Sequence, residues 1–237
     1  MENASYGALT RQSGLMREMQ TIAHNIANIS TTGYRREGVV FAEHVKQIDG
    51  GPSLSMATAT VRSTSPVQGG LAQTNAPFDL AIEGDGFFMV ETPDGERLTR
   101  AGSFTPNGEG ELVTPDGHRV LDAGGAPIFI PPDAGQVSVA ADGTVGANGR
   151  LLAQIGLFAP ADLNDLTRQS GTLFRAENGV EPVEGSSIIQ GFLEKSNVDA
   201  VSEVARMIEV QRAYEMGQGF MDKEDERIRN VMRTLGQ

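Results

Sequence analysis

The chain has 237 residues, of which 39% are hydrophobic and 5% aromatic, with no cysteine and a formal net charge of −12 at pH 7. The absence of cysteine excludes disulfides, thiolate metal sites and cysteine nucleophiles, and the negative charge argues against nucleic acid or an anionic membrane as a partner. The start, Met1–Tyr6, lacks the basic and apolar stretches of a cleaved secretory signal, and no apolar run approaches the ~20 residues that span a bilayer. We therefore expect no direct membrane insertion, and export, if it occurs, without a cleaved signal peptide.

The first predicted element is a helix that carries one apolar seam. Its residues recur at alternating steps of four and three, which is a heptad pattern: Leu15, Met19, Ile22, Ile26 and Ile29. The pattern stops at Ser30–Gly33, where Gly33 can adopt the left-handed backbone that closes a helix. Arg35 and Arg36 would then lie beyond the negative end of that helix. We assign residues 1–35 to the N-terminal helix of a helical core domain.

The residue composition and the apolar pattern change twice in the middle of the chain. Residues 36–75 are polar and rich in Gly, Ser and Thr, and they predict an extended connector. From 76 to 192, short apolar pieces alternate with turn signals such as Asp142-Gly143, and a turn signal at roughly every 8 to 12 residues is typical of an antiparallel sandwich or barrel. Only Pro160–Leu166 is predicted to be helical there. This β-rich outer domain is acidic, with 17 acids and 6 bases in 76–190.

Residues 193–237 predict the C-terminal helix of the helical core domain. Ser196 or Asn197 is the expected N-cap. Two glycines inside the helix, at 217 and 219, each cost roughly 1 kcal/mol of helix propensity and predict a kink or a close approach. A second apolar face indicates contact with more than one neighbour, and it consists of Val201, Val204, Ala205 and Ile208. The main seam follows heptad steps: Met207, Val210, Tyr214, Gly217, Met221, Glu224, Ile228, Val231 and Leu235.

These elements together predict an α+β fold in which long N- and C-terminal helices form a coiled-coil-like pair that brackets an inserted antiparallel β-sandwich or β-barrel. At about 1.5 Å per residue, the second helix, from about residue 198 to 235, would be roughly 57 Å long. The seams have two interpretations: the helices are core elements of an ordinary globule, or they pack mainly between molecules. We favour the second, because the first helix is too short to cover the other one.

No arrangement of residues in the sequence indicates catalysis, a cofactor site or a metal site. His24, His44 and His118 lie far apart and in no metal-ligand spacing. Glu83 and Asp85 are close in sequence, and a tight turn between two strands explains their spacing better than acid–base catalysis or calcium binding. We expect no enzyme activity.

The seams and the amides between them are the candidate assembly interface. Closely spaced asparagine side chains can bond laterally to a neighbouring helix or backbone, and faces that are not self-complementary build open helical arrays. The candidate interface residues are Leu15, Met19, Ile22, Asn25, Ile26, Asn28, Ile29, Met207, Val210, Gln211, Tyr214, Met221, Ile228 and Val231.

The segment His24–Tyr34 resembles the N-terminal signature of the flagellar axial family, which comprises rod, hook and hook-associated proteins. The family pattern has an Asn-Asn-Ile-Ala-Asn run followed by Thr-Thr-Gly-aromatic, and His24 stands where the first Asn is usual. The opening Tyr6–Gln12 is most similar to that of the proximal rod members. Further stretches resemble other blocks of the family in the same order along the chain: Phe78–Phe88, Leu98–Phe104, Ser196–Asp199 and Met207–Glu215.

The resemblance implies a structural subunit of the flagellar basal-body rod in the periplasm, exported through the flagellar type III apparatus. Its partners would be copies of itself and other rod proteins, with terminal segments that become ordered on assembly. A distal rod or hook-type subunit is an alternative within the same family. A secreted glycan-binding β-domain oligomerised by helices is another, disfavoured by the absence of tryptophan and by only three tyrosines. A third alternative, a hydrolase, is supported by no group of residues in the sequence.

Overall fold

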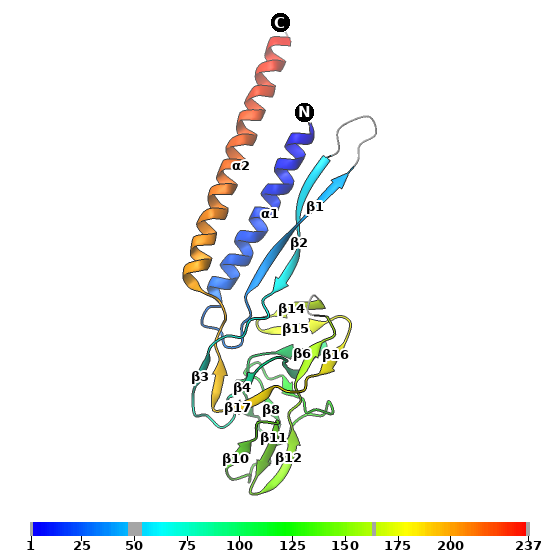
Figure 1. Ribbon diagram of the computed structural model, residues 1–237, viewed down its shortest axis with the longest axis vertical. Coiled ribbons are helices and arrows are strands. Elements are labelled where there is room, and N and C mark those ends of the chain that lie inside the picture. The colour runs from blue at the N-terminus through cyan, green and yellow to red at the C-terminus, as the bar shows by residue number, and fades with distance from the viewer. Residues whose placement is uncertain (1, 47–53, 163–164, 236–237) are drawn as a thin grey trace. The chain divides into compact units, whose positions relative to one another are not determined.

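The structure of the protein is a computed structural model that describes residues 2–46, 54–162 and 165–235. It confirms the α+β fold in which an N-terminal and a C-terminal helix bracket a mostly antiparallel β-rich region (Figure 1). The chain divides into two compact units. The helical unit comprises Met1–Ala27, Glu37–Ser65 and Asp199–Gln237, and the β unit comprises Asn28–Arg36 and Pro66–Val198. The backbone therefore crosses four times between them.

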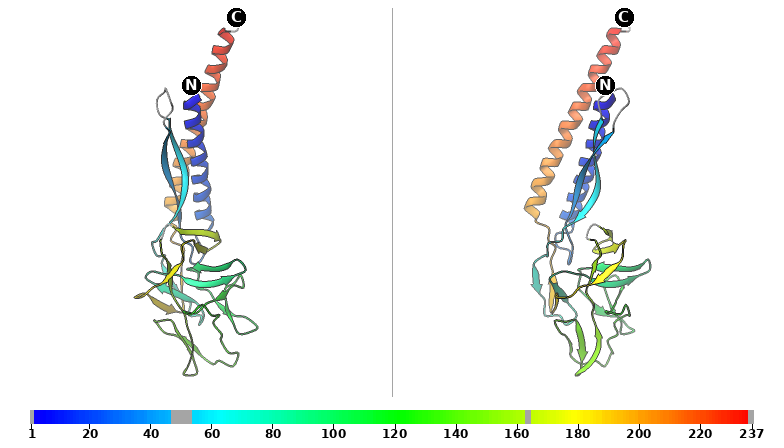
Figure 2. Two further views of the ribbon diagram at one scale, coloured as in Figure 1. Left: turned by 90° about the vertical axis from the view of Figure 1, so that its right-hand side faces the viewer. Right: turned by 45° about the vertical axis from the view of Figure 1, so that its right-hand side comes forward.

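The helical unit contains α1 (Glu2–Ala27), α2 (Ala200–Leu235) and a hairpin of β1 (Glu37–Lys46) and β2 (Leu54–Thr64). The two helices run antiparallel, and α1 packs against both α2 and the hairpin (Figure 2). The hairpin pairs from Glu37 with Thr64 to Lys46 with Leu54, with a bulge after Val40. The predicted boundaries at residues 35, 75 and 192 stay predictions. Within the stretch assigned to the connector, the structure places β1, β2 and β3 (Leu71–Gln73).

The apolar seams explain why α1 and α2 pair. Leu15, Ile22 and Val210 are buried between the helices, and they form the centre of the packing. Side chains from both helices lie partly buried around them: Met19, Ile26, Met207, Ala213 and Tyr214. Isolated helices are marginal in water, so this mutual burial is what stabilises each of them.

The two glycines of α2 do not break the helix, which is continuous over its 36 residues. Gly217 provides the predicted close approach instead of a kink. Gln12 Nε2 donates a hydrogen bond to the carbonyl of Tyr214 at 3.1 Å, and a Cβ at Gly217 would lie 2.9 Å from that same nitrogen. Gly219 has open space around it.

The N-cap of α2 is Asp199, and the prediction of Ser196 or Asn197 was wrong. Ser202 N donates to Asp199 Oδ1 at 2.8 Å, and Glu203 N donates to Asp199 O at 3.0 Å. The hydrogen bonds from Ser202 lower the pKa of the Asp199 carboxyl. Asn197 instead lies in the β unit, where its side chain bonds two other backbone segments.

The β unit is built from sixteen short strands within the described residues. Its largest sheet has seven strands in the order β14-β15-β6-β5-β9-β8-β7, and no sheet in the described part of the chain closes into a barrel. The smaller sheets pair β10-β11-β12, β13-β16, β17-β4 and β18-β3. The remaining strands are β4 (Leu80–Glu83), β5 (Phe88–Thr92), β6 (Gly95–Thr99), β7 (Thr105–Pro106), β8 (Leu112–Val113), β9 (Arg119–Val120), β10 (Val137–Val139), β11 (Thr144–Ala147), β12 (Arg150–Gln154), β13 (Phe158–Pro160), β14 (Leu166–Ser170), β15 (Leu173–Ala176), β16 (Val180–Pro182), β17 (Ser187–Gln190) and β18 (Phe192–Glu194).

The large sheet is buried on both faces. Phe88 and Val90 of β5 enter one apolar cluster, whereas Met89 between them enters another. Successive residues of a strand point to opposite faces, so each cluster covers one face of the sheet. Phe87 and Phe174 meet edge to face in the second cluster, with ring centroids 5.9 Å apart.

Most predicted turns are confirmed, and the one helical segment predicted in this region is helical only in part. Asp142-Gly143 turns the chain between β10 and β11, and residues 84–86 turn it between β4 and β5, which belong to different sheets. Within Pro160–Leu166, Pro160 ends β13 and Leu166 begins β14. Helical backbone is limited to Asp165, which is 3₁₀-helical and whose N donates to Asp162 O at 3.0 Å, and residues 163 and 164 lie outside the described residues. Pairing with β16 and β15 overrides the local helical preference.

Gly33 adopts the left-handed backbone that the sequence predicts, with φ of +69°. It does not close the first helix, however, because α1 ends at Ala27. A Cβ at Gly33 would lie 2.3 Å from the backbone nitrogen of Ala101. The glycine is therefore required by a close passage of two backbone segments within the β unit.

Neither helix in the described part of the chain is both long and apolar enough to cross a bilayer.

The two glycines of α2 give a matched test of the helix packing. Gly219→Ala should raise the free energy of unfolding of the helical unit by roughly 1 kcal/mol, because alanine favours helix and meets no neighbour. Gly217→Ala should gain less or lose stability, because its Cβ would displace the Gln12 amide. Urea unfolding followed by circular dichroism measures both, and equal gains would contradict the Gln12 contact.

The Asp199 cap should be lost in acid. Its folded-state pKa is lowered, so the cap stabilises α2 above the unfolded pKa and is lost as the pH falls through the folded pKa. We expect amide exchange in the first turn of α2, corrected for intrinsic rates, to accelerate relative to mid-helix below about pH 4. Asp199→Asn keeps an oxygen acceptor and should lack this pH dependence. The same response in both proteins would refute the assignment.

Candidate assembly interface

Half of the predicted interface residues lie where α1 and α2 pack against each other within one chain. Leu15, Ile22 and Val210 are buried there, with exposed fractions of 8%, 3% and 2%. Four more predicted residues surround them and are partly buried: Met19, Ile26, Met207 and Tyr214. These side chains already have partners in a single chain, so they are not a fully free surface.

Asn25 is also engaged inside the helical unit, where it is fully buried. Its Nδ2 donates to Glu37 O at 2.8 Å and to Glu203 Oε2 at 3.1 Å, and Glu37 N donates to Asn25 Oδ1 at 3.0 Å. The amide thus joins α1, β1 and α2. A buried carboxylate such as that of Glu203 needs donors, and Asn25 provides one of them.

An ion-pair network borders the same packing. Arg206 Nη2 lies 2.6 Å from Glu18 Oε1, and Arg206 Nη1 lies 3.2 Å from Glu209 Oε2. The hydrogen bond to Glu18 is the main reason that the pKa of Arg206 is raised. A groove of about 380 Å³ is lined by these three residues together with Leu15 and Val210, among others.

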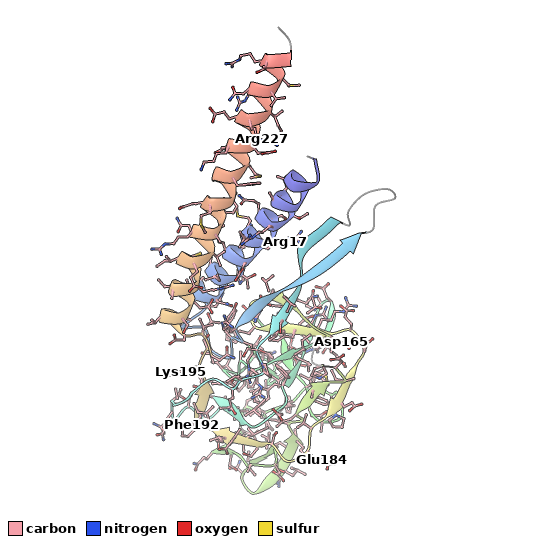
Figure 3. The ribbon with its side chains drawn as sticks, turned by 45° about the horizontal axis from the view of Figure 1, so that its top comes forward. Arg17, Asp165, Glu184, Phe192, Lys195 and Arg227 are labelled. Atoms are coloured by element: carbon pink, nitrogen blue, oxygen red, sulfur yellow. The ribbon has the colours of Figure 1, made fainter. Side chains whose placement is uncertain are left out.

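Several apolar side chains of α2 are exposed, among them Met216 and Phe220 at 71% and 51%, and two groups of them stand out. The outer stripe consists of Val201, Val204 and Ile208, which are 78%, 48% and 46% exposed. The tip consists of Ile228, Val231 and Met232, which are 39%, 48% and 69% exposed. The tip lies on the end of α2 that extends past the start of α1, near the labelled Arg227 (Figure 3). Ile228 and Val231 continue the seam of Val210 beyond the reach of α1.

The remaining predicted residues have varied surroundings. Gln211 is exposed and its Nε2 donates to Glu215 on the same helix at 3.1 Å. Met221 is half-buried, and Ile29 is 37% exposed. Asn28 belongs to the β unit, where its side-chain oxygen accepts a hydrogen bond from Thr31 Oγ1 at 3.1 Å. The sequence analysis grouped these four with the seam, but Gln211 and Met221 belong to the helical unit whereas Asn28 and Ile29 belong to the β unit.

Sequence reasoning missed a buried charge cluster in the β unit. Glu194, 1% exposed, contacts Arg35 Nη2 through Oε1 and Arg100 Nη1 through Oε2, each at 3.1 Å. The two arginines are 2% and 3% exposed. Arg35 therefore does not lie free beyond the end of a helix as predicted, because the carboxylate of Glu194 holds it inside. In the sequence, only Arg35 was singled out, because it follows Gly33 closely, and no local signal pointed to its partner Glu194.

Burial governs the electrostatics of this cluster. It lowers the pKa of Arg100 to about 10, with a further lowering from the charge of Arg35 and an opposing contribution from Glu194. Burial also lowers the pKa of Arg35, and Glu194 opposes it. The exposed carboxylate of Asp85 favours the charged form of both arginines. The Glu83–Gly86 turn thus has an electrostatic and structural role, because Arg100 Nη2 also donates to Gly84 O at 2.7 Å.

A stacked arginine completes the surroundings of the cluster. The guanidinium of Arg168 lies 4.3 Å from the ring centroid of Tyr34 and 4.5 Å from that of Phe174. Tyr34 is fully buried, and Arg168 Nη2 donates to Arg35 O at 2.6 Å. Cation–π contacts of this kind are strongest when desolvated, so Arg168 fixes Tyr34 against the large sheet.

Within the described residues, no group of three or more His, Cys, Asp or Glu side chains has the geometry to hold a metal ion.

Comparison with known proteins identifies the chain. Family models match three segments: "Flagella basal body rod protein" over residues 5–35, "Flagellar hook protein FlgE/F/G D1 domain" over 81–147, and "Flagellar basal body rod FlgEFG protein C-terminal" over 189–234. The flagellar basal-body rod protein FlgF of Caulobacter vibrioides is 40% identical over 242 residues, covering 100% of this chain and 99% of the relative. The chain belongs to the FlgF family of flagellar basal-body rod proteins.

Other members of this group are similar over nearly the same length. FlgF of Mesorhizobium japonicum is 39% identical over 100% of this chain and 99% of its own. FlgG of Bacillus subtilis is 32% identical over 98% of each chain. The matched N-terminal segment of this FlgF-family chain spans most of α1 and ends at Arg35, and the matched C-terminal segment contains Glu194 and most of α2.

The burial of Asn25 can be tested by a minimal change. Asn25→Asp removes the donor to Glu203 and places a second carboxylate beside it, so the free energy of unfolding of the helical unit should fall by roughly 2–4 kcal/mol. Gln211→Glu is the matched control, because Gln211 is exposed and its Nε2 also donates to a carboxylate, that of Glu215, so it should change stability by less than about 0.5 kcal/mol. Denaturant unfolding measures both, and equal effects would contradict the assigned roles.

Proposed function

We propose that this chain is a structural subunit of the flagellar basal-body rod, held in the rod by the apolar surfaces of its helical unit. Its membership of the FlgF family supports the place of action. The observation that carries the mechanism is the pair of exposed apolar surfaces on α2, the outer stripe and the tip. Large apolar side chains that stay exposed on one helix mark contact surfaces, because their burial against a neighbour is favourable.

The proposal assigns different roles to different parts of the helices. The paired seam around Leu15, Ile22 and Val210 stabilises the subunit itself. The outer stripe and the tip, together with Gln211 and Ile29, are the surfaces proposed for neighbouring subunits. The buried seam residues would act in assembly through the shape of the helix pair, and the two helices would extend their coiled-coil-like packing from one subunit to the next.

The neighbours would be copies of this chain and other rod proteins, in the periplasmic part of the basal body. We further propose that the subunit stands in the proximal rod, reaches it through the flagellar type III export apparatus without a cleaved signal, and has no catalytic activity. The acidic β unit, with its large sheet covered on both faces, would form a sandwich-like outer domain. A distal rod subunit is the alternative, because FlgG proteins match the chain over a comparable length.

Charged substitutions at the tip should block assembly without unfolding the subunit. Ile228→Asp and Val231→Asp replace exposed side chains, so the free energy of unfolding should change by less than about 0.5 kcal/mol. Rod incorporation, measured as the amount of the chain in isolated basal bodies, should fall at least about tenfold, since burying one unpaired carboxylate costs more than 1.4 kcal/mol. Swimming in soft agar should be lost with it.

Two further variants separate assembly from folding. Leu151→Asp changes a side chain that is 72% exposed on the β unit, and it should leave incorporation and swimming unchanged. Val210→Asp should unfold the helical unit outright. Normal swimming by cells that carry Ile228→Asp or Val231→Asp would contradict the proposed role of the tip if both variants show it.

A further inference from the structure

The β unit holds three separate backbone segments around the buried carboxylate of Glu194. The segments are 33–36, 66–70 and 194–197, and we call their junction the clasp. Each segment lies next to a point where the chain passes between the two units, at 36/37, 65/66 and 198/199. The labelled Lys195 marks the clasp in Figure 3.

Glu194 bonds both other segments directly. Its Oε1 accepts from Gly69 N at 3.0 Å as well as from Arg35, and its backbone carbonyl accepts from Gly33 N at 2.8 Å. Lys195 N donates to Gly70 O at 2.8 Å. One side chain and its neighbouring backbone therefore connect three parts of the chain that are far apart in sequence.

Arg35 and Asn197 connect the same segments a second time. Arg35 Nη1 donates to Pro66 O at 2.8 Å and also to Val67 O. Asn197 Oδ1 accepts from Arg36 N at 2.6 Å, and Asn197 Nδ2 donates to Val67 O at 2.6 Å. Asn197 N donates to Tyr34 O at 3.3 Å. Each pair of segments is thus joined by more than one bond.

The segment Asn28–Arg36 is short, and besides the clasp it is contacted by Arg168, which stacks on Tyr34 and donates to Arg35 O. The backbone does not connect this segment directly to the rest of the β unit, because the chain on both sides of it belongs to the helical unit. Noncovalent contacts alone hold it in the β unit. Its two largest buried side chains are Tyr34 and Arg35, at 0% and 2% exposure. When the segment leaves, Glu194 keeps Arg100 as its ion-pair partner, but Arg35 loses its carboxylate.

We infer that Asn28–Arg36 can detach from the rest of the β unit and that the contacts of Glu194 hold it in place. These contacts thereby fix the positions at which the chain leaves the β unit. Glu194 and Arg35 are then positioning residues, because they act on the geometry of the chain crossings. The inference concerns closure of the β unit and does not depend on the proposed place in the rod.

This role of Glu194 predicts that its substitution opens residues 28–36 locally and does not lower the stability of the whole β unit. Glu194→Gln leaves two buried arginines without their carboxylate, whereas Arg35→Met leaves Glu194 paired with Arg100. Hydrogen exchange followed by mass spectrometry on the full-length chain should show exchange in residues 28–36 faster by at least about tenfold in Glu194→Gln, less in Arg35→Met and least in Arg35→Lys. Peptides covering Leu112–Ile130 should keep their protection within about twofold.

Arg119→Met is the matched control, because Arg119 forms an ion pair of 2.7 Å with Glu91 in the same unit but is 42% exposed. It should leave residues 28–36 unchanged. Trypsin gives a second measurement, since Arg36 is exposed next to the clasp and should be cleaved at least about tenfold faster in Glu194→Gln than in the unchanged chain. Exchange that rises equally throughout the β unit, or unchanged exchange in residues 28–36 of all three clasp variants, would overturn the inference.

Discussion

The arrangement of three backbone segments in the β unit depends on one buried carboxylate. Glu194 lies among two arginines and three backbone segments, and every one of its contacts is made without access to water. A charge in such a place is tolerable only when it is paired and hydrogen-bonded. The cluster therefore specifies a single arrangement of the segments around it, since a displaced segment would leave a buried charge unmatched. Apolar contacts alone, which are not directional, would specify the arrangement less strictly.

The helical unit is organised on a different principle. Its two helices differ in length, so an apolar seam that is continuous along α2 is covered by α1 over only part of its course. Where it is covered, Asn25 and Gln12 add polar contacts that are sensitive to register, because each amide must meet one particular backbone group. Where it is not covered, the same periodic side chains are exposed. One sequence pattern thus serves both internal packing and the surface available to other subunits.

The periodic parts of this fold were predictable from the sequence. The heptad steps of Leu15, Met19 and Ile22 gave the first helix, and turn signals such as Asp142-Gly143 gave the short antiparallel strands. The clasp was not predictable, because Arg35, Arg100 and Glu194 are separated by 65 and 94 residues and no local pattern pairs them. Periodicity also failed to separate Val210, which is buried within the chain, from Val231, which is exposed. That distinction depends on where α1 begins and not on α2. The cap of α2 was misplaced for a related reason, because Asn197 is a good capping residue that the clasp already engages.

The four backbone crossings have a mechanical consequence. Two domains joined by a single linker transmit a pull or a twist through one peptide strand, and the linker stretches or turns before the load passes on. In this chain the backbone passes between the two units at four points, so a pull is carried by four covalent connections instead of one. Such a connection suits a part that must carry a load.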